Sequence, residues 1–145
     1  MSIKNYLNNI ELNVDIKSKK EAFELVFKLL KSNNAVKDEY LASMIERDNK
    51  SSVAIGNLIA IAHGTVESKD LILKDTIVML VLKNPIMWDG NEVRVVLGLA
   101  LSGDKTMDVI GNIGIAFSDE DEVKSIFSNP NLTAENVLDW LASQE

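Results

Sequence analysis

The segment 76–82 constrains the fold of this chain more than any other feature of its sequence. An apolar residue stands at every position after Thr76, so the run is Ile-Val-Met-Leu-Val-Leu. Successive side chains of a β-strand point to opposite faces of its sheet, so this run would be apolar on both faces. Such a strand is expected at the centre of a sheet that other elements cover on both sides.

Other segments have the pattern of strands that belong in the same sheet. Apolar residues at 10, 12 and 14 alternate with polar ones, which predicts a half-buried strand. Residues 53–55 and 58–61 flank Gly56-Asn57, which predicts two short strands around a tight turn. Asp89-Gly90 is a second turn signal, and it leads into a further apolar strand over 93–101.

Helical periodicity begins between these strands. Ser18 and Glu21 have the spacing of a capping box, which predicts a helix start. The apolar stripe of this helix is Phe23, Val26, Phe27 and Leu30. A second helix is expected over 38–48, with Arg47 near its end. Its expected buried residues are Leu41, Met44 and Ile45.

The last third of the chain is expected to be helical. One helix opens at 102–104, and Ser118 and Thr133 are the expected N-caps of two short terminal helices. The residues of the first helix expected to face the core are Met107, Ile110, Ile113 and Phe117. Because helices and strands alternate without a linker or repeat, we predict one α/β domain over residues 1–145, a mixed β-sheet of about five strands flanked by helices on both faces.

The charge balance excludes some classes of partner. The chain has 15 Lys and Arg against 22 Asp and Glu, a net charge of −7, whereas a nucleic-acid-binding module needs a basic face toward phosphate. No apolar run approaches the roughly 18 residues that span a bilayer. Residues 1–6 lack the basic start and apolar run of a signal peptide. We therefore expect a cytoplasmic protein with no nucleic-acid partner and no direct membrane insertion.

Imidazole chemistry can occur at only one position, because His63 is the single histidine. The chain has no cysteine, which excludes disulfides, thiolate metal sites and thiol nucleophiles. His63 lies between a predicted strand and Gly64, where small neighbours leave its ring uncrowded. An unperturbed imidazole titrates at about 6.5, so much of it is a neutral nucleophile near neutral pH. The alternative is a strand-end histidine that merely hydrogen-bonds a carbonyl.

We expect neither a metal nor a cofactor, since only carboxylates remain as further ligands. Glu67 and Asp70 lie on a solvated stretch, and the acidic run 119–122 follows a predicted N-cap, where carboxylates complement the helix dipole. The Walker and G-x-G-x-x-G patterns are absent. A serine hydrolase triad is not expected, because no second histidine can activate a serine.

The run 56–70 carries a more specific signal: Gly-Asn-Leu-Ile-Ala-Ile-Ala-His-Gly-Thr-Val-Glu-Ser-Lys-Asp. It resembles enzyme IIA of the fructose/mannitol class of the bacterial phosphoenolpyruvate-dependent sugar phosphotransferase system, and is most similar to the mannitol branch. The similarity covers nearly the whole chain, from the first strand and capped helix to the Leu-Asp-Trp-Leu segment near the end.

The resemblance implies that His63 accepts a phosphoryl group from the phosphohistidine of the phosphocarrier protein HPr and passes it to enzyme IIB. In the mannitol branch the acceptor on enzyme IIB is a cysteine. The family's active site includes an arginine near the end of the second helix, and Arg47 matches it. A guanidinium group suits phosphate oxygens bidentately. By position alone, Arg47 would be an exposed helix-end cation.

Two positions depart from the family pattern. Ala62 stands where a proline usually precedes the histidine, and Thr106 stands where the family usually carries a second histidine. Thr106 can donate a hydrogen bond but cannot carry the positive charge of an imidazolium. Transfer would then be slower, or the neighbouring Lys105 would compensate.

The expected function is a phosphoryl relay through His63, with HPr as donor and the enzyme IIB/IIC components of a mannitol or other hexitol transporter as recipients. One alternative is a regulatory or interaction domain that keeps the enzyme IIA fold but does not relay phosphate efficiently. Another is a relay of the fructose or nitrogen-regulatory branch, which differs only in its partners.

Overall fold

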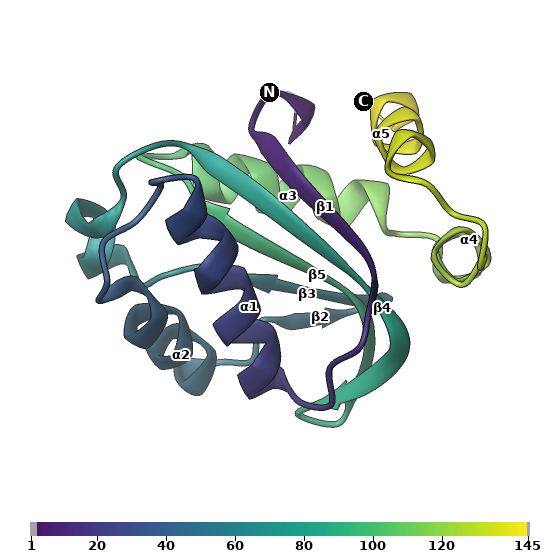
Figure 1. The fold of residues 1–145 in the computed structure, drawn as a ribbon, viewed down its shortest axis with the longest axis horizontal. Coiled ribbons are helices and arrows are strands. Elements are labelled where there is room, and N and C mark those ends of the chain that lie inside the picture. Colours follow the sequence, from purple (N-terminus) through teal and green to yellow (C-terminus); the bar gives the residue numbers. More distant parts are fainter. Residues whose placement is uncertain (1–2, 145) are drawn as a thin grey trace.

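A computed structural model describes residues 3–144, so residues 1, 2 and 145 of the expected domain lie outside the described part. Five strands of this part form one sheet in the order β1-β4-β5-β3-β2 (Figure 1). The strands are β1 (Leu7–Val14), β2 (Ala54–Gly56), β3 (Leu58–Ala62), β4 (Thr76–Trp88) and β5 (Asn91–Ala100). The expected α/β fold with a mixed sheet is confirmed.

The pairing of the strands places two carboxyl ends at one edge. β1 is parallel to β4 and β3 is parallel to β5, whereas β4–β5 and β2–β3 are antiparallel hairpins. The hairpin turns are at Asp89-Gly90 and Gly56-Asn57, as predicted, and all four turn residues have positive φ. Because β3 and β5 are parallel, the segments that follow them begin at the same edge of the sheet.

Alternate side chains of β4 belong to two separate apolar cores, which confirms the expectation for 76–82. Val78 and Leu80 pack under α1 and α2, and Ile77 and Met79 pack under α3, α4 and α5. Figure 1 shows α1 and α2 on one face of the sheet and α3 across the other. The helices are α1 (Lys19–Ser32), α2 (Tyr40–Lys50), α3 (Lys105–Ala116), α4 (Glu120–Phe127), α5 (Ala134–Ser143) and the 3₁₀ segments η1 (Ile3–Asn5) and η2 (Val66–Leu71). None of the helices among residues 3–144 is long and apolar enough to cross a bilayer.

The second helix differs in detail from its prediction. It starts and ends later than 38–48, and it buries Met44 as expected, while Leu41 and Ile45 are only half-buried. Tyr40, which the apolar periodicity missed, is 1% exposed. The buried face is therefore turned toward positions 40 and 44, which lie one above the other on a helix.

The prediction for Met107 is wrong, because its side chain is 70% exposed. The core face of α3 consists of Val109, Ile113 and Ala116, while Ile110 is half-buried. Met107 lies on the side of α3 that faces away from the sheet, as does Ile115, which is also 70% exposed.

The helix caps are confirmed in part. Thr133 caps α5 in a capping box with Asn136. The cap of α4 is Asp119 and not Ser118, because the Asp119 side chain accepts a hydrogen bond from the backbone N–H of Glu122. At α1, Ser18 accepts from the Glu21 N–H as predicted, but the Glu21 carboxylate accepts from the N–H of residue 17 and not from that of the cap itself.

Asp48 anchors the end of α2. Its carboxylate is buried and accepts hydrogen bonds from Lys19 Nζ at 2.8 Å, Trp88 Nε1 at 3.0 Å and the Val53 N–H at 3.1 Å. Burial alone would raise the pKa of Asp48, but these three hydrogen bonds outweigh burial and hold the pKa below its ordinary value. The contacts join α2 to α1, to β4 and to the segment entering β2. They therefore hold in place the end of α2, where Arg47 lies.

We expect Asp48→Asn to lower the free energy of unfolding near pH 7 by about 1 to 3 kcal/mol, since a buried charged pair with Lys19 is lost. A carboxyl group with a lowered folded-state pKa stabilises the protein above its unfolded-state pKa, here about 3.8. This stabilisation is lost as the pH falls through the folded-state pKa. In urea unfolding, the difference between wild type and variant should therefore shrink below about pH 4.

The matched control is Asp139→Asn, at an exposed position of α5. It should change stability by less than about 0.5 kcal/mol at either pH. An Asp48→Asn effect of the same size near pH 7 and near pH 3 would contradict the role given to the Asp48 carboxylate.

Candidate functional site

His63 follows β3 directly, at the edge where β3 and β5 both end. Its side chain is half-buried, and Nδ1 lies 2.9 Å from the carbonyl oxygen of Ile61. A carbonyl oxygen can only accept a hydrogen bond, so Nδ1 carries the proton and, in the neutral ring, Nε2 keeps its lone pair. The carbonyl contact of the alternative interpretation is therefore present, and it leaves Nε2 as the nucleophilic atom.

The electrostatic surroundings keep this imidazole neutral. Burial lowers the pKa of His63 below its ordinary value of 6.5, the hydrogen bond to the Ile61 carbonyl acts in the opposite direction, and the positive charge of Arg47 lowers the pKa further. The net effect is a lowered pKa, so the uncharged ring is the main form near pH 7.

Arg47 lies near the end of α2, as predicted. Its side chain is half-buried, and Nη1 donates a hydrogen bond to the carbonyl oxygen of Ser51 at 2.8 Å. Its charge acts on His63. The two residues that the sequence analysis singled out come from α2 and from the end of β3, and the charge of one acts on the ring of the other. They combine a nucleophilic nitrogen with a guanidinium group of the kind that suits phosphate oxygens.

Thr106 lies in the first turn of α3, which begins at the same edge of the sheet because it follows β5. Its hydroxyl donates a hydrogen bond to the carbonyl oxygen of Leu101 at 3.2 Å. The Lys105 ammonium pairs with the Asp75 carboxylate and lies 5.9 Å from the centre of the Tyr6 ring. Both candidates for the role of the second histidine therefore already have partners within the chain.

Tyr40 holds the loop after β3 (residues 63–65), and sequence reasoning missed it. Its hydroxyl accepts a hydrogen bond from the Gly64 N–H at 3.0 Å and donates one to the Leu99 carbonyl at 2.7 Å. Burial raises the pKa of Tyr40 to about 12, although the Gly64 hydrogen bond acts to lower it. The hydroxyl therefore stays protonated and joins β5 to the residue after His63.

Ser43 makes a second such contact from the same helix, and it too was missed. Its Oγ accepts a hydrogen bond from the Thr65 N–H at 2.9 Å. Positions 40, 43 and 47 have the spacing of one helix face, which is the sequence signal that relates both residues to Arg47.

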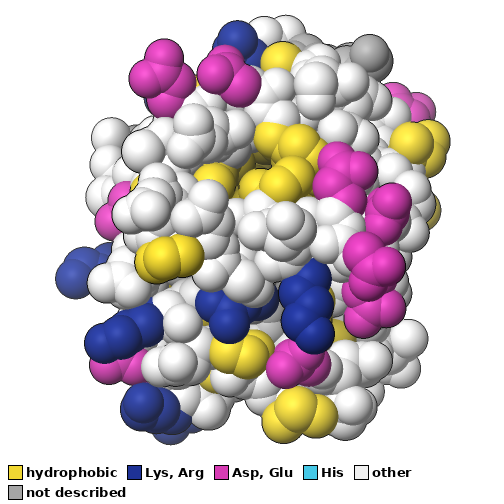
Figure 2. Space-filling view, turned by 90° about the vertical axis from the view of Figure 1, so that its right-hand side faces the viewer, with side chains coloured by type: hydrophobic (Ala, Val, Ile, Leu, Met, Phe, Trp, Pro, Cys, Tyr) yellow, Lys and Arg dark blue, Asp and Glu magenta, His cyan; other side chains and the backbone are white. Residues whose placement is uncertain are grey.

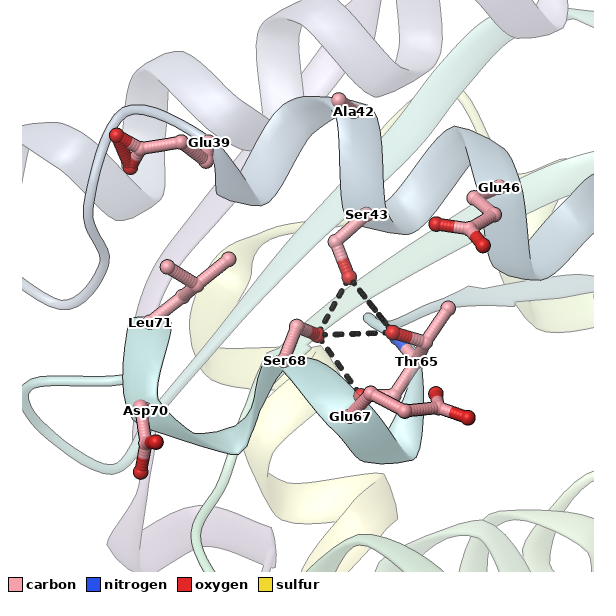
Figure 3. Close-up of a pocket in the computed structure, with 9 residues that line it drawn as sticks. All are labelled: Glu39, Ala42, Ser43, Glu46, Thr65, Glu67, Ser68, Asp70 and Leu71. Carbon is pink, nitrogen blue, oxygen red and sulfur yellow. Dashed lines mark hydrogen bonds between the residues drawn. The ribbon is translucent and has the colours of Figure 1, made fainter.

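The hydroxyl groups of Ser43, Thr65 and Ser68 meet beside a hollow of about 360 Å³ (Figure 3). Ser68 Oγ donates to the Thr65 carbonyl at 2.8 Å and accepts from Thr65 Oγ1 at 3.2 Å. The carboxylates that line the hollow are Glu39, Glu46, Glu67 and Asp70. Their negative charge disfavours phosphate, so the part of this edge that suits an anion is the one at His63 and Arg47.

A second hollow of about 450 Å³ lies between β4, the end of β1 and the segment after α4. Figure 2 shows this side of the molecule, where apolar side chains line a recess between basic and acidic ones. The residues that line this second hollow include neither His63 nor Arg47. Among residues 3–144, no three histidine, cysteine, aspartate or glutamate side chains come together in a way that could hold a metal ion.

The chain is similar to known proteins over most of its length. The family described as "Phosphoenolpyruvate-dependent sugar phosphotransferase system, EIIA 2" matches residues 6–141. The mannitol-specific phosphotransferase enzyme IIA component of Mycoplasma pneumoniae is 42% identical over 135 residues, which are 93% of this chain and 94% of that protein.

Two solved structures from Escherichia coli are similar over most of the chain. The complex of enzyme IIAMTL and phosphorylated enzyme IIBMTL matches with a TM-score of 0.84 and 25% identity, over 99% of this chain and 97% of that chain. The crystal structure of IIA mannitol matches with a TM-score of 0.82 and 27% identity, over 92% of this chain and 95% of that chain.

We expect Gly64→Ala to lower the free energy of unfolding by about 1 to 3 kcal/mol, the usual cost of overpacking. A Cβ there would lie 2.7 Å from Tyr40 Cε1 and 2.8 Å from both Ser43 Oγ and Ser68 Oγ. The matched control is Gly111→Ala in α3, where the added methyl meets open space and should stabilise the helix by about 0.5 to 1 kcal/mol. Urea unfolding measures both, and a Gly64→Ala protein as stable as wild type would contradict the close packing of this loop.

We expect the His63 imidazole to titrate below 6.5, and Arg47→Gln to raise its pKa, because a nearby positive charge is removed. An NMR titration of the ring protons measures both values. Lys50→Gln is the control, since it removes an exposed cation from the same helix. A wild-type pKa at or above 6.5, or the same pKa in Arg47→Gln, would show that Arg47 and burial do not act on the ring as described.

Proposed function

Since the chain belongs to the EIIA 2 family of the phosphoenolpyruvate-dependent sugar phosphotransferase system, we propose that it relays a phosphoryl group on His63 to enzyme IIB. Components of this kind are phosphotransferase relay proteins. The observation that carries the proposal is the neutral imidazole whose Nδ1 is held by the Ile61 carbonyl while the charge of Arg47 acts on the same ring.

The relay has two steps, and each exchanges one bond to phosphorus for another. The Nε2 lone pair of His63 first attacks the phosphorus of phosphohistidine on HPr, and the electron pair of the broken N–P bond returns to the donor nitrogen. A nucleophile on enzyme IIB, a cysteine thiolate in the mannitol branch, then attacks the same phosphorus, and Nε2 recovers its lone pair.

The residues of this chain supply what such transfers require. Phosphoryl transfer depends on in-line placement of donor and acceptor and on stabilisation of charge on the equatorial oxygens. The hydrogen bond to the Ile61 carbonyl orients the ring of His63, and the Arg47 guanidinium supplies positive charge beside it. Little covalent work by the protein is needed, so a single histidine is sufficient for the chemistry.

The partners and the sugar follow from the relatives. The Mycoplasma pneumoniae relative is mannitol-specific, and one of the similar structures is a complex with phosphorylated enzyme IIB. We therefore propose enzyme IIB of a mannitol or related hexitol system as acceptor, with enzyme IIC as its membrane component. HPr as donor and a cytoplasmic location rest on the family resemblance.

A second candidate function has one observation in its favour. By the family resemblance, Thr106 stands where the family usually carries a second histidine. Its hydroxyl already donates to the Leu101 carbonyl, and Lys105 is paired with Asp75. A regulatory or interaction domain that keeps the fold without efficient transfer would have such a site. A relay of the fructose or nitrogen-regulatory branch differs from the main proposal only in its partners.

We expect the protein, incubated with phosphoenolpyruvate, enzyme I and HPr, to take up acid-labile phosphate and to lose it again when enzyme IIB of a mannitol system is added. His63→Ala should take up none, because the nucleophile is gone. Arg47→Gln should take up phosphate on the order of a hundredfold more slowly, the usual effect of removing one charge-stabilising donor. Arg94→Gln is the matched control, since it replaces the only other arginine of the sequence.

Each outcome of this assay bears on the proposal. Equal uptake by wild type and His63→Ala would overturn the relay through His63. Phosphate that is taken up but passes to no enzyme IIB would favour the regulatory domain. A wild-type rate in Arg47→Gln would remove Arg47 from the site.

A further inference from the structure

We propose that the hydroxyl groups of Tyr40 and Ser43 are positioning groups for the relay, because they hold the two backbone amides that follow His63. The inference rests on the proposed function, since it concerns the same histidine. It goes beyond that function in assigning a role to two residues that do not themselves touch phosphate.

The two backbone amides that follow His63 both donate hydrogen bonds to side chains of α2. The Gly64 N–H donates to the Tyr40 hydroxyl at 3.0 Å, and the Thr65 N–H donates to Ser43 Oγ at 2.9 Å. Both donors therefore already have acceptors on α2. They hold the backbone that follows His63 in place.

The contact made by Tyr40 is rigid. Tyr40 is 1% exposed, and its own hydroxyl proton is donated to the Leu99 carbonyl in β5. Since β5 pairs with β3, this one hydroxyl connects the loop after β3 to the sheet as well as to α2. The absence of a side chain at Gly64 allows the close approach, because a Cβ there would lie 2.7 Å from the Tyr40 ring.

These contacts also determine the orientation of the His63 ring. His63 is fixed on its preceding side by the contact of Nδ1 with the Ile61 carbonyl and on its following side by the two amide contacts to α2. With both sides held, the direction of Nε2 is determined by the fold and not by the ligand. Release of the amides would let the backbone turn and weaken the Ile61 contact that selects the tautomer.

Arg47 lies on the same helix, α2, as Tyr40 and Ser43. Tyr40, Ser43 and Arg47 follow the spacing of one helix face, and the Asp48 carboxylate anchors the end of that helix. One rigid element therefore carries both the contacts that hold His63 and the guanidinium that acts on it. This arrangement couples the orientation of the nucleophile to the position of the positive charge.

The test compares Tyr40→Phe and Ser43→Ala with wild type in two measurements. The first is the ¹⁵N NMR spectrum of the His63 ring in the unphosphorylated protein, which reports the share of each tautomer. The second is the rate of phosphate uptake from phosphorylated HPr. We expect Tyr40→Phe to raise the share of the Nε2–H tautomer and to slow uptake on the order of tenfold or more, as misplaced reacting groups do. Ser43→Ala should show the same two changes to a smaller extent.

The matched controls are Tyr6→Phe, which removes the hydroxyl of the only other tyrosine, and Ser118→Ala, which removes an exposed hydroxyl. Both should keep the wild-type tautomer and rate. If Tyr40→Phe does not fold, Ser43→Ala alone tests the proposal, because this substitution removes a smaller group from the core.

Two results would overturn the proposal. The first is that Tyr40→Phe and Ser43→Ala both fold and both keep the wild-type tautomer and the wild-type rate of phosphate uptake. The second is slower uptake with an unchanged tautomer, which would mean that the hydroxyls do not act through the ring of His63. Failure of wild type itself to take up phosphate would instead contradict the proposed function, and the tautomer measurement would still test whether Tyr40 and Ser43 orient the ring.

Discussion

Burial of the central strands on both faces is the constraint on which the rest of this structure depends. Every residue of β3 is buried, as are the first seven of β4 and the last six of β5. Each Val, Leu, Ile or Met side chain among them contributes roughly 1.5 to 3 kcal/mol when it is fully removed from water. The two faces can be covered only by separate groups of helices, and the chain supplies α1 and α2 for one face and α3, α4 and α5 for the other.

The same constraint decides where polar chemistry can occur. A strand buried on both sides has no room for a charged or reactive side chain, so such groups stand where the strand ends. His63 is the first residue after β3, and Thr106 lies just beyond β5 at the same edge.

The charged side chains of the chain, whose net charge is −7, are unevenly distributed. The carboxylates Glu39, Glu46, Glu67 and Asp70 line a hollow on one side, while Arg47 provides the positive charge that acts on His63.

Local patterns in the sequence located the five strands but not all of their ends, and they were insufficient for parts of the helices. β4 runs on to Trp88, beyond the predicted segment 76–82. The turns at Gly56-Asn57 and Asp89-Gly90 are determined by residues that adopt positive φ, so they are visible in the sequence. Met107 was misplaced because apolar residues stand on more than one side of α3, and only packing against the sheet decides which of them are buried. At α4, Ser118 and Asp119 are neighbouring good caps, and the local backbone selects the second.

At the site, too, the sequence indicates some residues and not others. The family resemblance points to His63 and Arg47 as the proposed site residues, because the residues themselves carry the signal. It did not locate Tyr40, whose hydroxyl bonds to backbone atoms 24 and 59 residues away in the sequence. Backbone acceptors and donors have no residue identity, so no sequence pattern records such a contact. The orientation of the histidine therefore became visible only with the fold.

The central claim is that the Ile61 carbonyl holds Nδ1 of His63 and leaves Nε2 to receive phosphate. The most direct test is a ³¹P and ¹⁵N NMR spectrum of the ¹⁵N-labelled protein after phosphorylation by HPr. We predict phosphorus bonded to Nε2 of His63, with Nδ1 still carrying its proton. Phosphorus bonded to Nδ1, or to another residue, would contradict the account.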